Sequence, residues 1–459
     1  MNRFHTLYHQ CFIAQCLRST PAALLAVLFF LPAHAAGDMQ INNWIVHEEA
    51  QLTSPPGDTE TQAELKALKA RIAELDEEDR RNIVHWTGSG PNHRWIQLIL
   101  ETIDKGPPSP LKGRALALMN IAIYDAVATA TRAKQQFDRP RPALNTPADS
   151  KRSHLSYPSA HAAAAAAASE VLTYLYPDNT ERYRSAFSDA ARARLDAGLN
   201  YPSDIDAGTK IGRRVAAGII EWAKNDLSDT PFTGERPTGR GVLKGEKFVY
   251  PTAGEWRTFA IKSVDKYLPA APPTHDSQQI QDELKALKAI PQSLPNLMMA
   301  WTQHSTKTAY RWWYEQMALA MFENDLHWDA LTSAHIYASL SAINQDSITA
   351  CFNAKYEYWQ IRPSQLDSTI KTAFPNPPHP SYPSAHSCSS TTYGVVASHF
   401  FPQKKQLFMA AAEAGGQSRL NAGIHYPSDD TAGDMIGQQV AEEGLSFSMT
   451  LLNGKDTTN

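Results

Sequence analysis

A set of residues that occurs twice, in the same order, is the feature that most constrains this chain. The first set comprises Lys134, Arg141-Pro142, Pro158-Ser159-Ala160-His161, Arg194 and Asp204, and the second comprises Lys355, Arg362-Pro363, Pro383-Ser384-Ala385-His386, Arg419 and Asp429. The lysine precedes the first arginine by seven residues in both sets, and the histidine precedes the second arginine by 33 in both. Repeated intervals of this kind are typical of an internal duplication. We therefore expect two related halves.

Both halves are predicted to be helical. Apolar residues recur at helical spacing over 113–134 and 330–361, and helices are also expected over 161–175, which opens with a run of alanines, and over 387–401. Pro-Ser ahead of the last two predicts an N-cap. Strand-like alternation is scarce. The expected fold class is all-α, with tandem helical bundles related by the duplication.

The predicted organisation has four segments. Residues 1–35 form a signal peptide, residues 36–225 the first helical repeat, residues 226–280 a linker rich in Gly, Pro and Thr, and residues 281–459 the second repeat. The chain of 459 residues is long enough for two such domains.

The amino terminus predicts export. Arg3 and Arg18 precede an apolar run from Ala22 to Leu31, and Ala33-His34-Ala35 has the small-x-small form of a signal peptidase site. The run is shorter than the roughly 20 residues that span a bilayer. We therefore expect a periplasmic or secreted protein with no integral membrane segment after signal removal.

Composition excludes some partners. A net charge of -4 and a pI near 6.5 provide no long-range field for nucleic acid. After signal removal the chain keeps only Cys351 and Cys388. In an oxidising compartment these two either form a disulfide or pack as thiols, and both alternatives stay open. Nothing in the sequence indicates an oligomeric state.

The second set gathers positive charge. Lys355 and Arg362 are predicted to lie two turns apart on one helix face, which Pro363 would end, and Arg419 adds a third cation. Arginine suits bidentate recognition of phosphate. Ser384 is expected at a helix N-terminus, where free N–H groups favour an anion. This pattern predicts a site for a tetrahedral or trigonal-bipyramidal oxyanion.

Histidines would complete the site. His425 is followed four residues later by Asp429, a spacing that suits a nucleophilic imidazole oriented by a carboxylate, and His386 is placed to protonate a leaving oxygen. Each motif alone is usually structural: a solvated helix face with a proline stop, a helix start, a hydrogen-bonded histidine. Their joint, ordered occurrence predicts phosphoryl-transfer chemistry without a divalent metal.

The first set departs at the reactive position. Asn200 stands where His425 stands, and Ala193 stands where Ser418 stands. An asparagine cannot carry a transferred group, so we expect the chemistry in the second half. The first half either holds an anion without turning it over or is a structural half whose cations are relics or form internal ion pairs, and the second alternative is preferred.

The second set resembles a known signature. Lys355 to Pro363, Pro383 to His386 and Ser418 to Asp429 are similar to the Lys-x6-Arg-Pro, Pro-Ser-Gly-His and Ser-Arg-x5-His-x3-Asp motifs of the type 2 phosphatidic acid phosphatase (PAP2) and vanadium haloperoxidase superfamily. The flanks Ala354 to Trp359 and Gly254 to Arg257 resemble secreted bacterial members described as haloperoxidase-related.

This resemblance implies a role for each residue. Lys355, Arg362 and Arg419 would bind the phosphate or vanadate oxygens, assisted by Ser384 and the backbone N–H of Ala385. His425, oriented by Asp429, would attack phosphorus or ligate vanadium, and His386 would act as acid and base. Ala385 replaces the glycine of the family, and it would carry strain if the loop needed a positive φ.

Three functions follow from the resemblance. The first is a phosphatase that hydrolyses small phosphate monoesters through a phosphohistidine and needs no cofactor. The second is a vanadate-dependent haloperoxidase that uses hydrogen peroxide and halide, and the third is a catalytically silent anion-binding protein. The 31 residues between His386 and Ser418 favour the phosphatase. The flanks of Lys355 favour the haloperoxidase, for which Trp359 would line a halide pocket unless it packs in the core.

Overall fold

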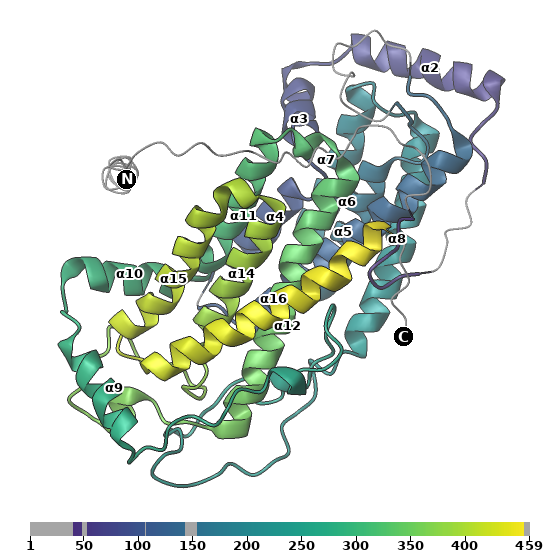
Figure 1. The fold of residues 1–459 in the computed structure, drawn as a ribbon. Coiled ribbons are helices and arrows are strands. Elements are labelled where there is room, and N and C mark those ends of the chain that lie inside the picture. Colours follow the sequence, from purple (N-terminus) through teal and green to yellow (C-terminus); the bar gives the residue numbers. More distant parts are fainter. Residues whose placement is uncertain (1–39, 48–52, 106, 143–153, 454–459) are drawn as a thin grey trace, which may run out of the picture. The chain divides into compact units, whose positions relative to one another are not determined.

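The computed structural model describes residues 40–47, 53–105, 107–142 and 154–453. Throughout these ranges the regular structure is helical, with two isolated β-bridges and no β-strand, which confirms the predicted all-α class (Figure 1). The predicted signal peptide lies outside the described residues, so export stays a prediction. None of the described helices is long and apolar enough to cross a membrane.

The longest described connection between helices is the linker from α8 to α9. The first half contains α2 (Asp58–Ala73), α3 (Glu77–Thr87), α4 (His93–Thr102), α5 (Pro110–Phe137), α6 (Ala160–Leu175), α7 (Thr180–Asp196) and α8 (Pro202–Lys224). The second contains α9 (Gln278–Ala289), α10 (Leu294–His304), α11 (Thr306–Glu323), α12 (Ala330–Tyr358), α13 (Pro363–Leu366), α14 (Ala385–Phe400), α15 (Lys405–Asn421) and α16 (Pro427–Asn453). Single 3-10 turns are η1 (Pro177–Asn179), η2 (Ala253–Glu255), η3 (Asp265–Tyr267), η4 (Leu326–Trp328) and η5 (Pro402–Lys404).

The helices that carry the two motif sets occur in the same order. The series α5, α6, η1, α7, α8 corresponds to α12, α14, η5, α15, α16, and α6 packs on α8 as α14 packs on α16. Asn120 of α5 donates to the Oγ of Ser341 of α12 at 2.9 Å, and these two residues differ by the same 221 positions as Lys134 and Lys355. Descent of the halves from one ancestor stays a prediction.

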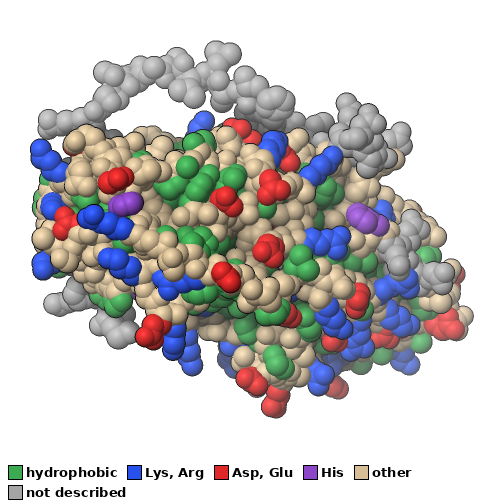
Figure 2. All heavy atoms as spheres, turned by 90° about the horizontal axis from the view of Figure 1, so that it is seen from below, with side chains coloured by type: hydrophobic (Ala, Val, Ile, Leu, Met, Phe, Trp, Pro, Cys, Tyr) green, Lys and Arg blue, Asp and Glu red, His purple; other side chains and the backbone are tan. Residues whose placement is uncertain are grey.

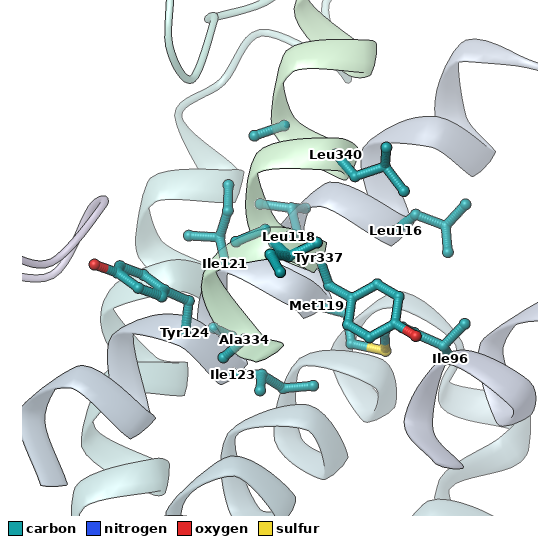
Figure 3. Close-up of a cluster of buried hydrophobic side chains, with 14 of the residues drawn as sticks. Ile96, Leu116, Leu118, Met119, Ile121, Ile123, Tyr124, Ala334, Tyr337 and Leu340 are labelled. Carbon is teal, nitrogen blue, oxygen red and sulfur yellow. The ribbon is translucent and has the colours of Figure 1, made fainter. Parts of the chain in front are cut away.

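One hydrophobic core serves both halves. Buried side chains of α5 such as Leu116 and Met119 lie close to Tyr337 and Leu340 of α12 (Figure 3). Residues 40–459 cluster as a single compact unit. The predicted domain boundaries at 225 and 281 therefore describe sequence repeats that share a core, and their independence stays a prediction. On the surface, Figure 2 shows basic and acidic side chains interspersed over the face in view, as the small net charge suggests.

Small residues bring the paired helices close together. The alanine run of α6 is buried, and a Cβ on Gly212 of α8 would lie 2.2 Å from the carbonyl oxygen of Ala163. In the second half, a Cβ on Gly433 of α16 would lie 2.6 Å from the carbonyl oxygen of Ser384. This close approach sets the start of α16 beside the start of α14, where the motif residues lie.

The prediction that one helix spans 330–361 was wrong at its end. The helix α12 stops at Tyr358, and Trp359 adopts a left-handed conformation with φ 50°. Its N–H still bonds the carbonyl of Lys355, while Ile361 donates to Gly241 of the linker at 2.9 Å. Arg362 is therefore on an extended segment and not on the helix face of Lys355.

Buried aspartates fasten irregular segments onto the central helices. The carboxylate of Asp346 on α12 accepts the backbone N–H groups of residues 259–261, and that of Asp125 on α5 accepts those of residues 44–46. Burial raises the pKa of Asp346 to about 7 and that of Asp125 to about 6. The linker is thus tied to the same helix that carries Lys355.

Candidate active site

Lys355 holds the loop that carries the Pro-Ser-Ala-His motif. Its ammonium is fully buried and donates to the carbonyl oxygens of Pro380 at 2.8 Å and Ser381 at 3.0 Å, and also to that of Pro383. Burial lowers the pKa of Lys355 to about 8. The predicted anion-binding cation is therefore also the group that positions the start of α14.

Arg362 connects this loop to the predicted nucleophile. Its Nη1 donates to the Nε2 of His425 at 2.9 Å and to the carbonyl of Ile424 at 2.8 Å. Its Nη2 donates to the carbonyl of His379 at 2.9 Å. The guanidinium is fully buried, which lowers the pKa of Arg362 to about 10 and leaves it charged at neutral pH.

The hydrogen bonds of His425 define its tautomer. Because a guanidinium can only donate, Nε2 must accept from Arg362, so the proton lies on Nδ1 and is donated to the Oδ2 of Asp429 at 2.8 Å. Burial, and then the charge of Arg362, lower the pKa of His425 well below its usual value. Burial raises the pKa of Asp429 to about 7. The imidazole is neutral, with its lone pair on the atom that faces the cations.

The last turn of α10 holds the second histidine and the third cation. The carbonyl of Gln303 accepts from the Nε2 of His386 at 2.9 Å, so His386 keeps Nδ1 as its proton acceptor. The carbonyl of Ala300 accepts from the Nη2 of Arg419 at 2.7 Å. Carbonyls at a helix C-terminus carry partial negative charge and favour such donors. Burial, then the charge of Arg419, lower the pKa of His386 well below its usual value.

Ser384 and Ala385 begin α14 as predicted. Ser384 is the N-cap, and its hydroxyl accepts from the N–H of Ser387 at 3.4 Å. Its own N–H donates to the carbonyl of Asp429 at 2.8 Å. Ala385 is the first helical residue and is not among the described residues with positive φ, so the expected strain is absent there. The N–H groups at this helix start lie beside the predicted histidines.

A cavity of about 560 Å³ opens over these groups. Ala385, His386, Arg419 and His425 form part of its lining. Lys355, Arg362 and Ser384 are buried and do not line it, but they are joined to the lining by the hydrogen bonds described above. The structure thus brings the residues predicted for the site either into the lining of this cavity or into hydrogen-bond contact with groups that line it.

Sequence reasoning missed His379 and the helix α10. His379 lines the cavity, and its Nδ1 lies 3.2 Å from the Nη2 of Arg362. A signal was present, since a histidine precedes the motif histidine by seven residues in both sets, as His154 and as His379. The contribution of α10 had no such signal, because it is made by backbone carbonyls that every residue possesses.

The structure also shows the surroundings of Trp359 and of the two cysteines. Trp359 packs against Phe248 and Tyr356, with ring centroids 5.2 Å and 4.9 Å away, and it is a core residue that does not line the cavity. Cys351 and Cys388 are buried free thiols in the structure. Across the described ranges no cluster of His, Cys, Asp or Glu is arranged to hold a metal ion.

The first motif set contains a dense ion-pair network. Arg139 donates to Asp204 at 2.8 Å and to Glu64 at 2.9 Å, and its side chain is almost fully buried. Asn200, which stands where His425 stands, accepts from the Nε of Arg194, the counterpart of Arg419, at 3.0 Å. The carboxylate that corresponds to Asp429 is held by Arg139, which is not one of the predicted cations of the first set. The structural interpretation of the first half stays a prediction.

Solved structures of other proteins share this fold. The fold is that of bacterial vanadium haloperoxidases: an iodoperoxidase described as the first of its bacterial kind aligns with a TM-score of 0.59 and 19% identity, covering 86% of this chain and 98% of that chain. A bacterial vanadium-dependent chloroperoxidase aligns in its holo form with a TM-score of 0.59 and in its apo form with 0.61, at 12% identity, covering 77% and 76% of this chain and 95% and 96% of those chains. No curated protein sequence matches the chain.

A family model matches part of the sequence. Residues 330–442, which run from the first residue of α12 into α16, match the family model described as the PAP2 superfamily. The matched segment contains Lys355, Arg362, His386, Arg419 and His425.

Proposed function

We propose that this protein is an enzyme that hydrolyses phosphate monoesters through a phosphohistidine formed on His425. The observation that carries the proposal is the orientation of this imidazole. Its Nδ1 proton is held by Asp429 and its Nε2 lone pair is directed at Arg362, on the side of the cations. A neutral, carboxylate-oriented imidazole among positive charges is the arrangement that nucleophilic attack on a phosphate requires.

The proposed reaction has two steps. In the first, Arg362 releases its hydrogen bond to Nε2 of His425, so that Nε2 forms a bond to phosphorus. The bond from phosphorus to the ester oxygen breaks, and His386 donates a proton to the departing oxygen. In the second, His386 takes a proton from water, the water oxygen bonds to phosphorus, and the P–N bond breaks to release phosphate. The imidazole of His425 is regenerated, and no electrons are transferred.

The buried cations supply most of the stabilisation. Lys355, Arg362 and Arg419 are each nearly or fully buried, so their fields act with little screening by water. Burial, and after it the charges of Arg419 and Lys355, disfavour a protonated His386 until an anion arrives. A phosphate dianion offsets them and restores the proton that the leaving group needs, which couples acid catalysis to substrate binding.

A second candidate function is that of a vanadate-dependent haloperoxidase. The structural neighbours with this activity in their names align over nearly their whole lengths. The site suits vanadate as well as phosphate, because both are oxyanions that need positive charge and a histidine nitrogen. His425 would ligate vanadium, Arg419 in the cavity lining would bind its oxygens, and the buried Lys355 and Arg362 would supply positive charge behind them. Bound vanadate would activate hydrogen peroxide for halide oxidation.

One preparation tests both candidates. Hydrolysis of p-nitrophenyl phosphate is measured from acid to neutral pH, and bromide and iodide oxidation are measured with hydrogen peroxide after loading with vanadate. Hydrolysis that disappears in His425→Ala, without halide oxidation, supports the phosphatase. Vanadate-dependent halide oxidation without hydrolysis refutes it in favour of the second candidate. Absence of both activities, with retained phosphate binding, supports a silent anion-binding protein.

A further inference from the structure

The cavity is much larger than the anion site at its end. A phosphate group would occupy only the part near His386, Arg419 and His425, whereas about 560 Å³ is the size of a pocket for a drug-sized organic molecule. The remaining walls come from the start of α5, the linker, the end of α10, the start of α11, α12 and the loop before α14. The polarity of the residues in these walls indicates which kind of alcohol is esterified to the phosphate in the substrate.

The walls contain few charged groups, and among their polar side chains Asn376 keeps a buried Oδ1 without a hydrogen-bond partner among the described residues. Of the described residues that line the cavity none is acidic, the only charged side chains are Lys112 and Arg419, and six are prolines, which lack an N–H. Several polar groups already have protein partners: Lys112 donates to two backbone carbonyls, Ser389 to Asn344 at 2.8 Å, and Tyr310 to the carbonyl of Ser109 at 3.3 Å. Hydroxyls buried here without partners would lose their bonds to water.

Aromatic rings form another part of the cavity wall. Phe352 lies edge-to-face with Tyr250, at 6.3 Å and 77° between ring planes, and its centroid lies 5.4 Å from that of His379. Ile348, one turn earlier on α12, extends the apolar surface. A flat apolar group gains both from burial and from offset or edge contacts with such rings.

We infer that the substrate is a phosphate monoester of a compact aromatic alcohol and not of a sugar, glycerol or nucleoside. This inference rests on the proposed function and specifies the class of substrate for the same site. Phe352 is the specificity-determining residue, because it presents the central ring of the aromatic wall and lies on the rigid helix α12, within one turn of Lys355.

The test compares esters whose leaving groups have similar intrinsic reactivity. The ratio of kcat/KM for 1-naphthylmethyl phosphate to that for glycerol 3-phosphate is expected to be on the order of 100, the scale of burying one aromatic group. In Phe352→Ala the ratio should fall about tenfold, and in Phe352→Leu, which keeps the bulk and the fold, it should fall less. Inhibition by vanadate should stay within about threefold in both, since the cations are unchanged. Phe187→Ala, a change in the first half, is the control and should leave the ratio unaltered.

A binding measurement tests this inference independently of the proposed function. Affinities of the full chain for 1-naphthylmethylphosphonate and 2,3-dihydroxypropylphosphonate are measured by calorimetry, which needs no turnover. Hydrolysis of both esters at equal rates, or a preference for glycerol phosphate, overturns the inference and leaves the phosphatase intact. No hydrolysis, with a strong and Phe352-dependent preference for the aromatic phosphonate, refutes the phosphatase and supports the aromatic class. Equal phosphonate affinities overturn the inference in either case.

Discussion

Replacing Asp429 by asparagine tests how much the negative charge of this carboxylate contributes to catalysis by His425, the proposed nucleophile. The Oδ2 of Asp429 accepts all the hydrogen bonds recorded for this carboxylate: from His425 at 2.8 Å, from Ser381 at 2.5 Å and from the N–H of Tyr426 at 3.1 Å. The Oδ1 atom is buried and has no hydrogen-bond partner among the described residues. An asparagine oxygen can therefore take the Oδ2 position, keep all these donors, and preserve the tautomer of His425.

The expected loss follows from the difference between charged and neutral hydrogen bonds. A hydrogen bond to a charged group contributes roughly 1.5–3 kcal/mol and a neutral one roughly 0.5–1.5 kcal/mol. The difference of about 1–1.5 kcal/mol on the bond to His425 corresponds to a fall in kcat of about tenfold. Since burial raises the pKa of Asp429 to about 7, the carboxylate is ionised only above that pH. The penalty of Asp429→Asn should be largest near pH 8 and shrink below pH 6.

The assay is the pH dependence of kcat for p-nitrophenyl phosphate in the wild type, Asp429→Asn and Ser381→Ala. The serine change removes one donor from the same oxygen without changing its charge, so its effect should stay within about threefold at every pH. Equal kcat for the wild type and Asp429→Asn at pH 8 would show that the charge is not used. A loss of about 10,000-fold would mean that the tautomer had changed, contrary to the argument from Arg362.

Three further predictions concern Lys355, the ion pairs of Arg139 and the two cysteine thiols. Burial lowers the pKa of Lys355 to about 8, so inhibition by vanadate should weaken as the pH rises through 8, and Lys355→Met should bind weakly with no such pH dependence. Arg139→Met leaves buried carboxylates unpaired and should lower the free energy of unfolding, measured in urea, by roughly 3–5 kcal/mol. The control Arg182→Met removes an exposed ion pair and should lower it by roughly 0–1 kcal/mol. An equally small loss in Arg139→Met would show that the ion pairs of Arg139 do not stabilise the fold. Cys351 and Cys388 should both titrate after unfolding without reductant, and finding neither would indicate a disulfide.

Much of the site was predictable because its chemistry is carried by side chains at characteristic intervals. His425 and Asp429, four residues apart, meet across the start of α16, and Ser384 caps α14 as the Pro-Ser pattern indicates. The all-α class followed from the apolar spacing of α5 and α12. The helical position assigned to Arg362 was wrong, because α12 ends in a left-handed turn at Trp359, as α5 does at Asp138, and neither position is marked by a glycine.

By itself, the sequence determined which residue types are available for an oxyanion and which half keeps its reactive histidine, since spacing and identity are properties of the chain. Only the tertiary structure decided how the groups are oriented. The carbonyls of Ala300 and Gln303 select the donors of Arg419 and His386, and Arg362 selects the tautomer of His425. A backbone carbonyl is the same in every residue, so its direction toward a distant side chain becomes known only when the helices have packed.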